Sequence, residues 1–501
     1  MKTSPALCRN GQSLPLAAVP ELAPDCFRMR VLERLAAGGR LCAYFGWTDG
    51  QGGVVLTAVL GFDQIGYLEL LCTRVEGRIA ALTPQAPEAH WFEREIAEQW
   101  GLALEGHPWN KPIRFQPPMG GTPSASEAIE IGVTDYFRVK GQEVHEVAVG
   151  PVHAGIIEPG HFRFQCHGET VLHLEIELGY QHRGIERALR GGPDARTRRY
   201  METLAGDTTV GHATAFALLM EGLSGRPAPA RAQSIRAVAL ELERLANHTG
   251  DLGALAGDVG FLPTAAYCGR LRGDFLNATA LLCGSRFGRN LVRPGGVGFD
   301  LSVRTAVELA KRLKVAFRDV QSAVELLWST PSVRARFEET GGLDGRDARA
   351  LGWVGPCARA CDVSRDVRYD HPWDAFKVHL IPPATWPTGD VFARARVRWL
   401  EMNRSLEFIL QQLQEMPGGP FLGEAAQPAP RSIAVALTEG WRGEICHVAV
   451  TDAHGRFAAY KVVDPSFHNW FALALALRGQ QISDFPLCNK SFNLSYCGHD
   501  L

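Results

Sequence analysis

The sequence predicts an α+β protein in which a small α+β domain is followed by a large, mainly α-helical domain. The N-terminal part mixes β-rich runs such as GGVVLTAVLGF and YLELLCTRV with a helical pattern in APEAHWFEREIAEQWGL. Farther along, IRAVALELERLANHTGDLGALAGDV and FARARVRWLEMNRSLEFILQQLQEM place apolar residues three or four positions apart, which is typical of long amphipathic helices. Between these parts, QPPMGGTPSASEAIEIG combines proline, glycine and serine, which favours a linker.

The expected division of the chain follows from these patterns. At 501 residues the chain is too long for one ordinary core, so more than one domain is expected. We predict a small domain over residues 1–115, a linker over 116–140 and a large domain over 141–501. The segment FRFQCHGETVLHLEIELGY predicts a β layer at the entrance of the large domain, and WRGEICHVAVTDAHGRFAAYKVVDP alternates like a hairpin.

Composition excludes several classes of protein. The formal net charge is −2, so nothing marks the chain as a nucleic-acid-binding protein, and no nucleic-acid partner is expected. The N-terminus makes a poor signal peptide, and the apolar runs are about half the length that a bilayer-spanning helix needs. We therefore expect a soluble protein that associates with a membrane only through partner subunits.

The twelve cysteines show no spacing that is typical of a metal site. No two of them form a Cys-x-x-Cys pair, and the only close pair is Cys357 and Cys361. Without an export signal, we expect reduced thiols rather than disulfides.

Several polar clusters are candidates for a site, although each has an ordinary structural explanation. His153, Glu158 and His161 lie among glycines and prolines in GPVHAGIIEPGHFRF, which on its own indicates a turn leading into a strand. Glu243 and His248 lie at helical spacing in ERLANHTGDLGALAGD, where a buried polar network is expected. No single motif of this kind identifies a function.

Taken in order along the chain, the motifs resemble one superfamily. The series is GPVHAGIIEPGHFRF, LGYQHRGIE, ERLANHTGDLGALAGDVGF, RPGGVGFD, VGPCARACDVSRDVRYDHPW, GDVFARARVRWLEMNRSLE and PGGP. It resembles the large subunit of energy-converting (group 4) nickel-iron hydrogenases and the related 49-kDa-type (D) subunit of respiratory complex I. The earlier stretch HWFEREIAEQWGLALEGHPW is similar to the signature of the 30-kDa-type (C) subunit. The chain thus resembles a fusion of both, as in formate hydrogenlyase large subunits.

The resemblance implies a hydrogenase-large-subunit-like fold and shows where nickel-iron ligands would lie. In those hydrogenases two Cys-x-x-Cys motifs supply the thiolates that hold nickel and iron. Aligning the first motif on Glu202 places its cysteines at Ala205 and Thr208. The second motif, aligned on SFNLSYCGHDL, places them at Ser495 and Gly498. Because none of the four is a cysteine, the resemblance predicts that no metal is bound and that the nickel-iron site is lost.

In complex I the equivalent cavity binds a quinone headgroup through a histidine and a tyrosine. His153 matches the histidine, but the tyrosine position falls on Gly206, so a quinone site is only half matched. A quinone-like ligand in the vacated cavity would contact His153, Thr208 and Ser495. The candidates for catalytic roles there are Glu158, His153, Asp207, His212 and Arg442.

Two of these candidates have roles that the resemblance suggests. Glu158 matches the position that passes protons in energy-converting hydrogenases, and an arginine such as Arg442 binds anionic or carbonyl groups. Buried carboxylates beside a histidine have the coupled pKa values that proton transfer requires. The other interpretation is that these groups only satisfy one another inside an inherited fold. Without a metal we expect no C-terminal cleavage, so the last residues, up to Leu501, would plug the cavity.

The resemblance favours a core subunit of a membrane-associated oxidoreductase complex. It would couple electron transfer, to a quinone or another small acceptor, to ion translocation. The expected partners are a small subunit with a 4Fe-4S cluster, similar to the B subunit of complex I, a ferredoxin-like subunit and membrane-arm subunits. No cofactor is expected to be bound directly by this chain, with a quinone left open as a ligand, and the expected location is the cytoplasmic face of the inner membrane. Two alternatives stay open: a non-catalytic scaffold of such a complex, and a nickel-iron hydrogenase of the formate hydrogenlyase type.

Overall fold

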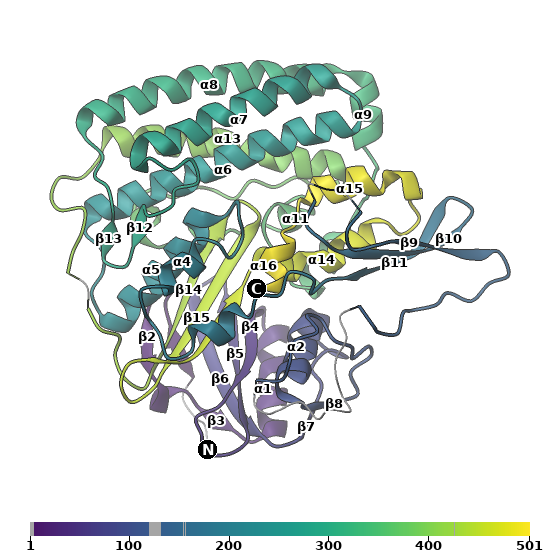
Figure 1. The fold of residues 1–501 in the computed structure, drawn as a ribbon, viewed down its shortest axis with the longest axis vertical. Coiled ribbons are helices and arrows are strands. Elements are labelled where there is room, and N and C mark those ends of the chain that lie inside the picture. The colour runs from purple at the N-terminus through teal and green to yellow at the C-terminus, as the bar shows by residue number, and fades with distance from the viewer. Residues whose placement is uncertain (1–4, 120–131, 154, 156, 425) are drawn as a thin grey trace.

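The computed structural model describes residues 5–119, 132–153, 155, 157–424 and 426–501. Within these residues the protein is built from both helices and sheets, which confirms the predicted α+β class. Figure 1 shows the N-terminal sheet at the bottom of the molecule and the long helices at the top. The predicted linker, residues 116–140, lies partly outside the described residues.

A meander of three long antiparallel strands forms the main part of the five-stranded N-terminal sheet. β4 (Arg40–Trp47) pairs with β5 (Val54–Phe62), and β5 pairs with β6 (Tyr67–Val75). The smaller strands of this part are β1 (Ala6–Cys8), β3 (Glu21–Leu22), β7 (Arg78–Ala80) and β8 (Ala103–Glu105). α1 (Pro24–Ala36) packs on the sheet through the fully buried Phe27 and Val31, and α2 (His90–Trp100) packs against β4.

A second antiparallel sheet has the order β16–β15–β14–β2. Its long strands are β14 (Ser432–Gly440), β15 (Gly443–Thr451) and β16 (Phe457–Val463), and every residue of β14 and β15 is buried. β2 (Ser13–Pro15) pairs with β14, with Leu14 opposite Ile433, so the first residues of the chain extend the sheet of its C-terminal part. α5 (Thr209–Ser224) packs on β14 and β15.

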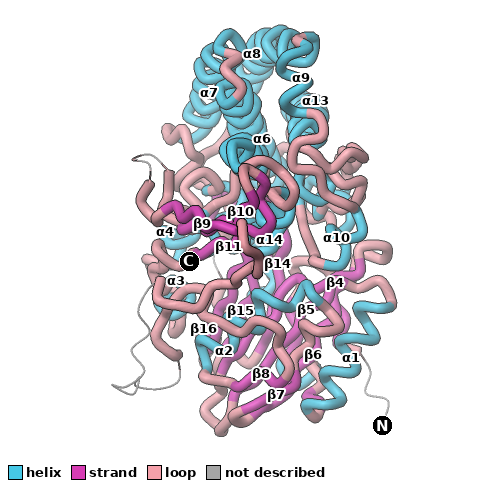
Figure 2. The backbone as a smooth tube through the Cα atoms, turned by 90° about the vertical axis from the view of Figure 1, so that its right-hand side faces the viewer, coloured by secondary structure: helices cyan, strands magenta, loops and turns pink. Residues whose placement is uncertain are grey.

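Four long helices form the upper layer in Figures 1 and 2. They are α6 (Ala230–Asp258), α7 (Leu262–Cys283), α8 (Val303–Ser329) and α13 (Val391–Gln414), and α6 and α13 confirm the two long helical patterns. Side chains cap two of them: Ser302 accepts from the Thr305 amide at α8, and Asp390 accepts from the Ala393 amide at α13. Among the described residues, no helix is both long enough and apolar enough to cross a membrane.

A three-stranded antiparallel sheet projects from the side of the molecule in Figure 1. It consists of β9 (Val144–Val149), β10 (His161–His167) and β11 (Thr170–Glu177), where the sequence predicts the entrance β layer. The C-terminal helices α14 (Pro465–Ala476), α15 (Phe485–Phe492) and α16 (Tyr496–Asp500) lie beside it. The remaining short elements are α3 (Ile185–Leu189), α4 (Thr197–Met201), β12 (Val292–Arg293), β13 (Gly296–Val297), α9 (Pro331–Phe337), α10 (Gly345–Ala350), α11 (Gly355–Arg359) and α12 (Val367–Asp370).

Candidate functional site

The two segments that carry the expected metal-ligand positions both contact Arg442, which lies in the turn between β14 and β15. Its guanidinium donates to both oxygens of the Asp207 carboxylate, at 2.5 and 2.8 Å, and to the Thr208 hydroxyl at 3.3 Å. Its Nε donates to the backbone carbonyl of Asn493, which lies just before α16. One side chain therefore connects the segment before α5 to the segment before α16.

The Arg442–Asp207 ion pair is held in a fixed geometry. Burial disfavours the charge on Arg442, but the nearby Asp207 carboxylate outweighs burial and raises the pKa of the guanidinium. The guanidinium carbon lies 3.9 Å from the centre of the Trp441 ring, a cation–π contact. The backbone carbonyl of Asp207 accepts from Trp441 Nε1 and Asn247 Nδ2, both at 3.0 Å.

A chain of buried hydrogen bonds runs from the sheet to the same place. His212 Nε2 lies 3.0 Å from Asp464 Oδ2, and His212 Nδ1 lies 3.1 Å from His447 Nε2. His447 Nδ1 lies 2.8 Å from the Tyr460 hydroxyl. Burial lowers the pKa of His447 well below its usual value. Burial alone would raise the pKa of Asp464, but the hydrogen bond from His212 and the charge of Arg442 outweigh it and lower that pKa.

The ionisation of Asp464 fixes the direction of one bond in this chain. The carboxylate only accepts, so His212 donates to it from Nε2. The side chains of Tyr460, His447, His212 and Asp464 are all buried and form a continuous hydrogen-bonded chain that ends on a carboxylate.

Gly498, one of the positions expected for a metal ligand, lies directly against this carboxylate. A Cβ added at Gly498 would lie 2.7 Å from Cγ and from Oδ2 of Asp464. The Asp464 carboxylate is held by the backbone amide of Ser466 at 2.8 Å, and the Ser466 hydroxyl accepts from the amide of Ser495 at 2.9 Å. The space that a side chain at position 498 needs is therefore occupied by Asp464.

The residues at the four ligand positions do not fit a nickel-iron centre. Ala205 and Gly498 have no donor atom, and Thr208 and Ser495 offer neutral hydroxyls, which are poor ligands for these metals. The hydroxyls are also engaged, since Thr208 accepts from Arg442 and Ser495 accepts from the Gly498 amide at 2.9 Å. In the part of the chain that the structure describes, no three His, Cys, Asp or Glu side chains are placed to hold a metal ion.

Known proteins match this chain along most of its length. The family model of the respiratory-chain NADH dehydrogenase 49-kDa subunit matches residues 258–433, and that of the 30-kDa subunit matches residues 44–127. Formate hydrogenlyase subunit 5 of Escherichia coli (strain K12) is 30% identical over 439 residues, which are 83% of this chain and 76% of that protein. The chain belongs to the complex I 49-kDa and formate hydrogenlyase superfamily.

Two further relatives represent the two branches of this superfamily. Hydrogenase-4 component G of Escherichia coli (strain K12) is 30% identical over 83% of this chain and 74% of its own length. NADH-quinone oxidoreductase subunit 4 of Thermus thermophilus is 30% identical over 68% of this chain and 90% of its own length. The predicted resemblance to both branches, and to the 30-kDa subunit at the N-terminus, is confirmed.

Two further candidate residues, Glu158 and His153, remain to be placed in the structure. Glu158 is half-buried beside α16, where its carboxylate accepts from the Tyr496 amide at 3.1 Å, and burial together with Glu158 raises the pKa of the Cys497 thiol to about 11. His153 is exposed: its Nδ1 lies 2.8 Å from the Gly150 carbonyl, and its ring packs edge-on against Phe162. Thus Asp207, Thr208 and Arg442 are brought together, whereas within the described residues no hydrogen bond or ion pair joins His153 to them.

Sequence reasoning missed His447 and Tyr460 and did not assign a role to Asp464 or Glu243. Glu243 accepts from the amides of Val210 and Gly211 at the start of α5, at 2.7 and 3.1 Å, and burial raises its pKa to about 8. The signal for His447 was weak: one polar residue within the apolar alternation of GEICHVAV.

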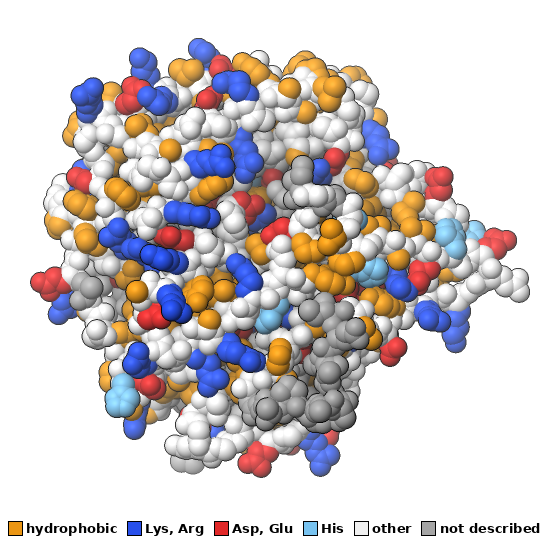
Figure 3. Space-filling model, viewed as in Figure 1, with side chains coloured by type: hydrophobic (Ala, Val, Ile, Leu, Met, Phe, Trp, Pro, Cys, Tyr) orange, Lys and Arg blue, Asp and Glu red, His pale blue; other side chains and the backbone are white. Residues whose placement is uncertain are grey.

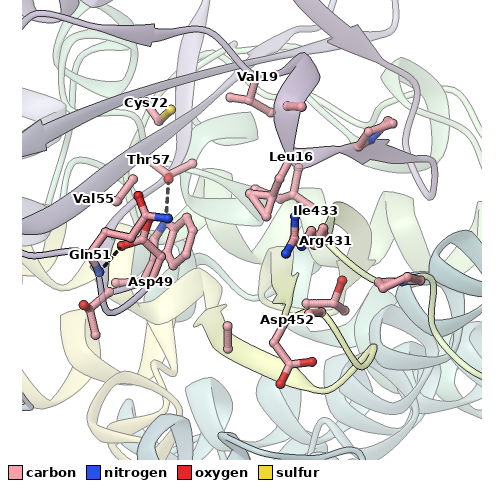
Figure 4. Close-up of a pocket in the computed structure, with 18 of the residues that line it drawn as sticks. Leu16, Val19, Asp49, Gln51, Val55, Thr57, Cys72, Arg431, Ile433 and Asp452 are labelled. Carbon is pink, nitrogen blue, oxygen red and sulfur yellow. Dashed lines mark hydrogen bonds between the residues drawn. The ribbon is translucent and has the colours of Figure 1, made fainter.

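A large cavity lies away from this centre. It measures about 880 Å³ and lies between the N-terminal sheet and the loops of the second sheet, with Asp49, Arg431 and Asp452 on its walls (Figure 4). The cavity beside Asp207 and Glu243 measures only about 10 Å³. The centre is thus filled by protein groups.

Proposed function

We propose that this chain is the core subunit of a membrane-associated, complex I-like complex, related to energy-converting hydrogenases, that works without a nickel-iron site. In this complex, electron transfer to a quinone or another small acceptor is coupled to ion translocation. The observation that carries the proposal is that residues other than cysteine occupy the four ligand positions. Above all, the Asp464 carboxylate fills the space in which a side chain at position 498 would lie. The relatives support it, because they are named as subunits of both quinone oxidoreductases and hydrogenases.

The proposed role of the polar centre is to hold and pass protons. When His212 gains a second proton at Nδ1, its Nε2 proton passes to Oδ2 of Asp464, and the same proton returns to Nε2 when the proton on Nδ1 leaves. His447 and Tyr460 are positioning residues, since their hydrogen bonds hold the His212 ring with its Nε2 toward Asp464. Arg442 and Asp207 keep the centre closed and electrically balanced.

The proposed partners are a small subunit with a 4Fe-4S cluster, a ferredoxin-like subunit and the membrane arm, on the cytoplasmic face of the inner membrane. A basic face beside α16 supports a partner with an acidic surface there. Figure 3 shows Lys and Arg side chains gathered over the region of α4. The exposed arginines of this region are Arg183, Arg187, Arg190, Arg196 and Arg199.

Metal analysis of the native complex tests the absence of the nickel-iron site. We expect iron from the clusters of partner subunits and no stoichiometric nickel in the complex purified through a tag on this chain. One nickel per chain would overturn the proposal and favour a hydrogenase.

Cluster oxidation tests the proton-holding role. In the complex, the reduced 4Fe-4S cluster is mixed with a soluble quinone and its reoxidation is followed by EPR. We expect Asp464→Asn to slow the proton-coupled step by about 10²-fold or more, and Glu325→Gln, an exposed carboxyl on α8, to leave it unchanged. A wild-type complex that never reoxidises its cluster would favour the non-catalytic scaffold, which the full packing of the centre also fits.

His153→Ala separates two versions of quinone binding. If the exposed His153 binds the quinone, this substitution abolishes quinone-dependent reoxidation. If activity survives, the quinone or other acceptor binds elsewhere.

A further inference from the structure

A cavity with basic walls lies where the N-terminal segment meets the large domain. It measures about 580 Å³, a volume that is typical of a site for a small molecule. Three segments line it: residues 9–12 between β1 and β2, residues 65–66 in the turn between β5 and β6, and part of the segment 371–377 after α12. The cavity thus joins parts of the chain that are more than 300 positions apart.

Two cationic side chains of this cavity are available to a ligand. Lys377 is exposed, and in the part of the chain that the structure describes its ammonium group has no hydrogen bond and no ion pair. Arg9 lies over the Tyr67 ring, 5.3 Å from its centre, and donates to the Tyr67 hydroxyl only at 3.4 Å. Such long hydrogen bonds to a neutral oxygen are weak, so the guanidinium keeps its donors for a stronger acceptor.

Gln12 adds an uncharged donor beside Arg9. Its Oε1 accepts from the Arg9 amide at 2.9 Å, and its own amide donates to the Arg9 carbonyl at 3.0 Å. The side-chain Nε2 of Gln12 carries two donor hydrogens, and no other described residue accepts from it. Because this turn joins Arg9 to Gln12, the two side chains offer their donors from the same wall of the cavity.

The lining of the cavity carries no opposing charge. Among the described residues that line it there is no aspartate and no glutamate. Asp63 contacts the lining residue His371, with Oδ1 3.0 Å from Nε2, but it also binds Arg40 and Arg365. Burial disfavours the charge of Asp63, yet these partners outweigh burial and lower its pKa. The negative charge of Asp63 is therefore already compensated inside the protein.

Two acidic residues close to Lys377 in the sequence also have other partners. Asp374 is mostly buried and lies 3.5 Å from a guanidinium nitrogen of Arg236. Asp370 accepts from the Asp366 amide at 2.9 Å. An anion in the cavity therefore meets cations and an amide donor, with little competition from carboxylates.

Ile65 and Pro372 give the cavity an apolar side. Ile65 is 62% exposed at the turn between β5 and β6, and Pro372 is half-buried on the opposite segment. An inorganic phosphate ion fills only a small part of a cavity of this volume. The apolar side therefore leaves room for an organic group attached to the anion.

We propose that this cavity binds a small phosphate monoester. A phosphate group carries about two negative charges at pH 7 and three strong acceptor oxygens, which match two cations and an amide better than a carboxylate does. The phosphate pairs with Arg9 and Lys377 and accepts from Gln12, and the organic group packs on the apolar side. The ligand would also fix the first residues of the chain to the large domain. Its binding does not depend on the proposed function.

Calorimetry on the full-length chain at constant ionic strength tests the ligand class with phenyl phosphate, inorganic phosphate and benzoate. We expect phenyl phosphate to bind at least about fivefold more tightly than inorganic phosphate, because its ring adds apolar contact. We expect benzoate to bind at least about tenfold more weakly than phenyl phosphate, because it has fewer charges and acceptors. Equal affinity for the two phosphates would overturn recognition of a monoester, and equal affinity for benzoate would overturn selection of phosphate.

Variants with one charged donor removed locate the binding. Arg9→Gln and Lys377→Gln should each lower the affinity for phenyl phosphate at least about tenfold. Both side chains are exposed, so the fold tolerates these changes. Lys314→Gln is the control, because Lys314 is an exposed lysine on α8, outside the cavity. Equal losses for Lys314→Gln and Lys377→Gln would overturn the proposed site.

A matched pair at Ile65 tests the role of charge. Ile65→Asp introduces the carboxylate that the lining lacks, whereas Ile65→Asn has nearly the same shape and no charge. We expect Ile65→Asp to abolish binding of phenyl phosphate and Ile65→Asn to keep most of it. The same affinity in both variants would show that the cavity does not select an anion.

Discussion

Gly498 is the residue of the polar centre with the least room for a side chain, because the Asp464 carboxylate lies where its Cβ would be. Gly498→Cys restores the cysteine that the superfamily pattern has at this position, yet we expect it to destabilise the fold by about 1–3 kcal/mol through overpacking. Chemical unfolding followed by circular dichroism measures this loss. Gly206→Ala is a matched control, since no atom lies within 4 Å of its added Cβ.

A double substitution identifies the cause of this loss. Asp464→Ala removes the carboxylate, so the cost of Gly498→Cys should be smaller in that background. An unchanged cost would show that Asp464 is not the obstacle.

Glu243 predicts a dependence of stability on pH. Its pKa is about 8 in the folded protein, against 4.5 for an ordinary glutamate. Between these pH values the folded state holds a proton that the unfolded state has released, so Glu243 makes stability fall as the pH rises. Glu243→Gln should therefore remove a slope of up to about 1.4 kcal/mol per pH unit. Unfolding free energies from pH 5 to pH 8.5 measure it, and identical slopes in the two proteins would contradict a raised pKa of Glu243 in the folded protein.

Part of the centre could be predicted from the sequence, because each short motif fixes the spacing of the residues within it. The positions of Ala205, Thr208 and Arg442 came from short motifs, and the structure brings Thr208 and Arg442 into contact. The partners of His212 were out of reach of this reasoning, because His447 is 235 positions away and lies in a strand that is otherwise apolar. The exposure of His153 could not be predicted either, because His153 matches its motif position and yet is exposed to solvent in the structure.

At the scale of elements, long patterns were predictable and short pairings were not. The helical periods over α6 and α13 and the β-rich runs of β5 and β6 correspond to elements in the structure. β2 has only three residues, and its partner strand begins more than 400 positions later, so no local pattern identifies it. Such a short segment forms a strand because it pairs with a distant strand, not because of the β propensity of its own residues.

The Asp500 carboxylate is one of the groups that attach the short helix α16 to the rest of the protein. The two oxygens of Asp500 accept from the backbone amides of Gly179 and Gln181 at 2.8 and 2.9 Å, and Asp500 is fully buried. Asp500→Ala leaves both donors unpaired, so we expect a loss of about 2–5 kcal/mol. Because α16 carries Gly498 and borders Glu158, the loosened segment should also exchange its amide hydrogens faster.

Hydrogen exchange with mass spectrometry measures this effect on peptides that cover residues 493–501. The control is Asp258→Ala, which removes a partly exposed ion pair with Lys490 on α15. Equal exchange in both variants would show that the other contacts of α16, such as the hydrogen bonds of Arg114 to the His499 carbonyl, hold it without the Asp500 carboxylate.

At the scale of the whole molecule, the N-terminal part and the large domain share a buried ionic interface. Arg40 of β4 donates to both oxygens of Glu444 on β15 and also binds Asp63, and Arg40 and Glu444 are almost fully buried. Together with the pairing of β2 on β14, this contact makes separate unfolding of the two parts costly. We therefore expect one cooperative transition in differential scanning calorimetry, even though the chain resembles a fusion of two subunits.

Removing one partner tests whether this interface joins the two parts. Arg40→Ala leaves Glu444 buried without its cation, so we expect a loss of about 3–5 kcal/mol that lowers the single transition as a whole. Arg78→Ala breaks an exposed pair with Glu105 and should cost at most about 1 kcal/mol. If Arg40→Ala instead splits the calorimetric peak in two, the N-terminal part folds independently. Proteolysis should then release it as a stable fragment, and Arg40 would only dock it.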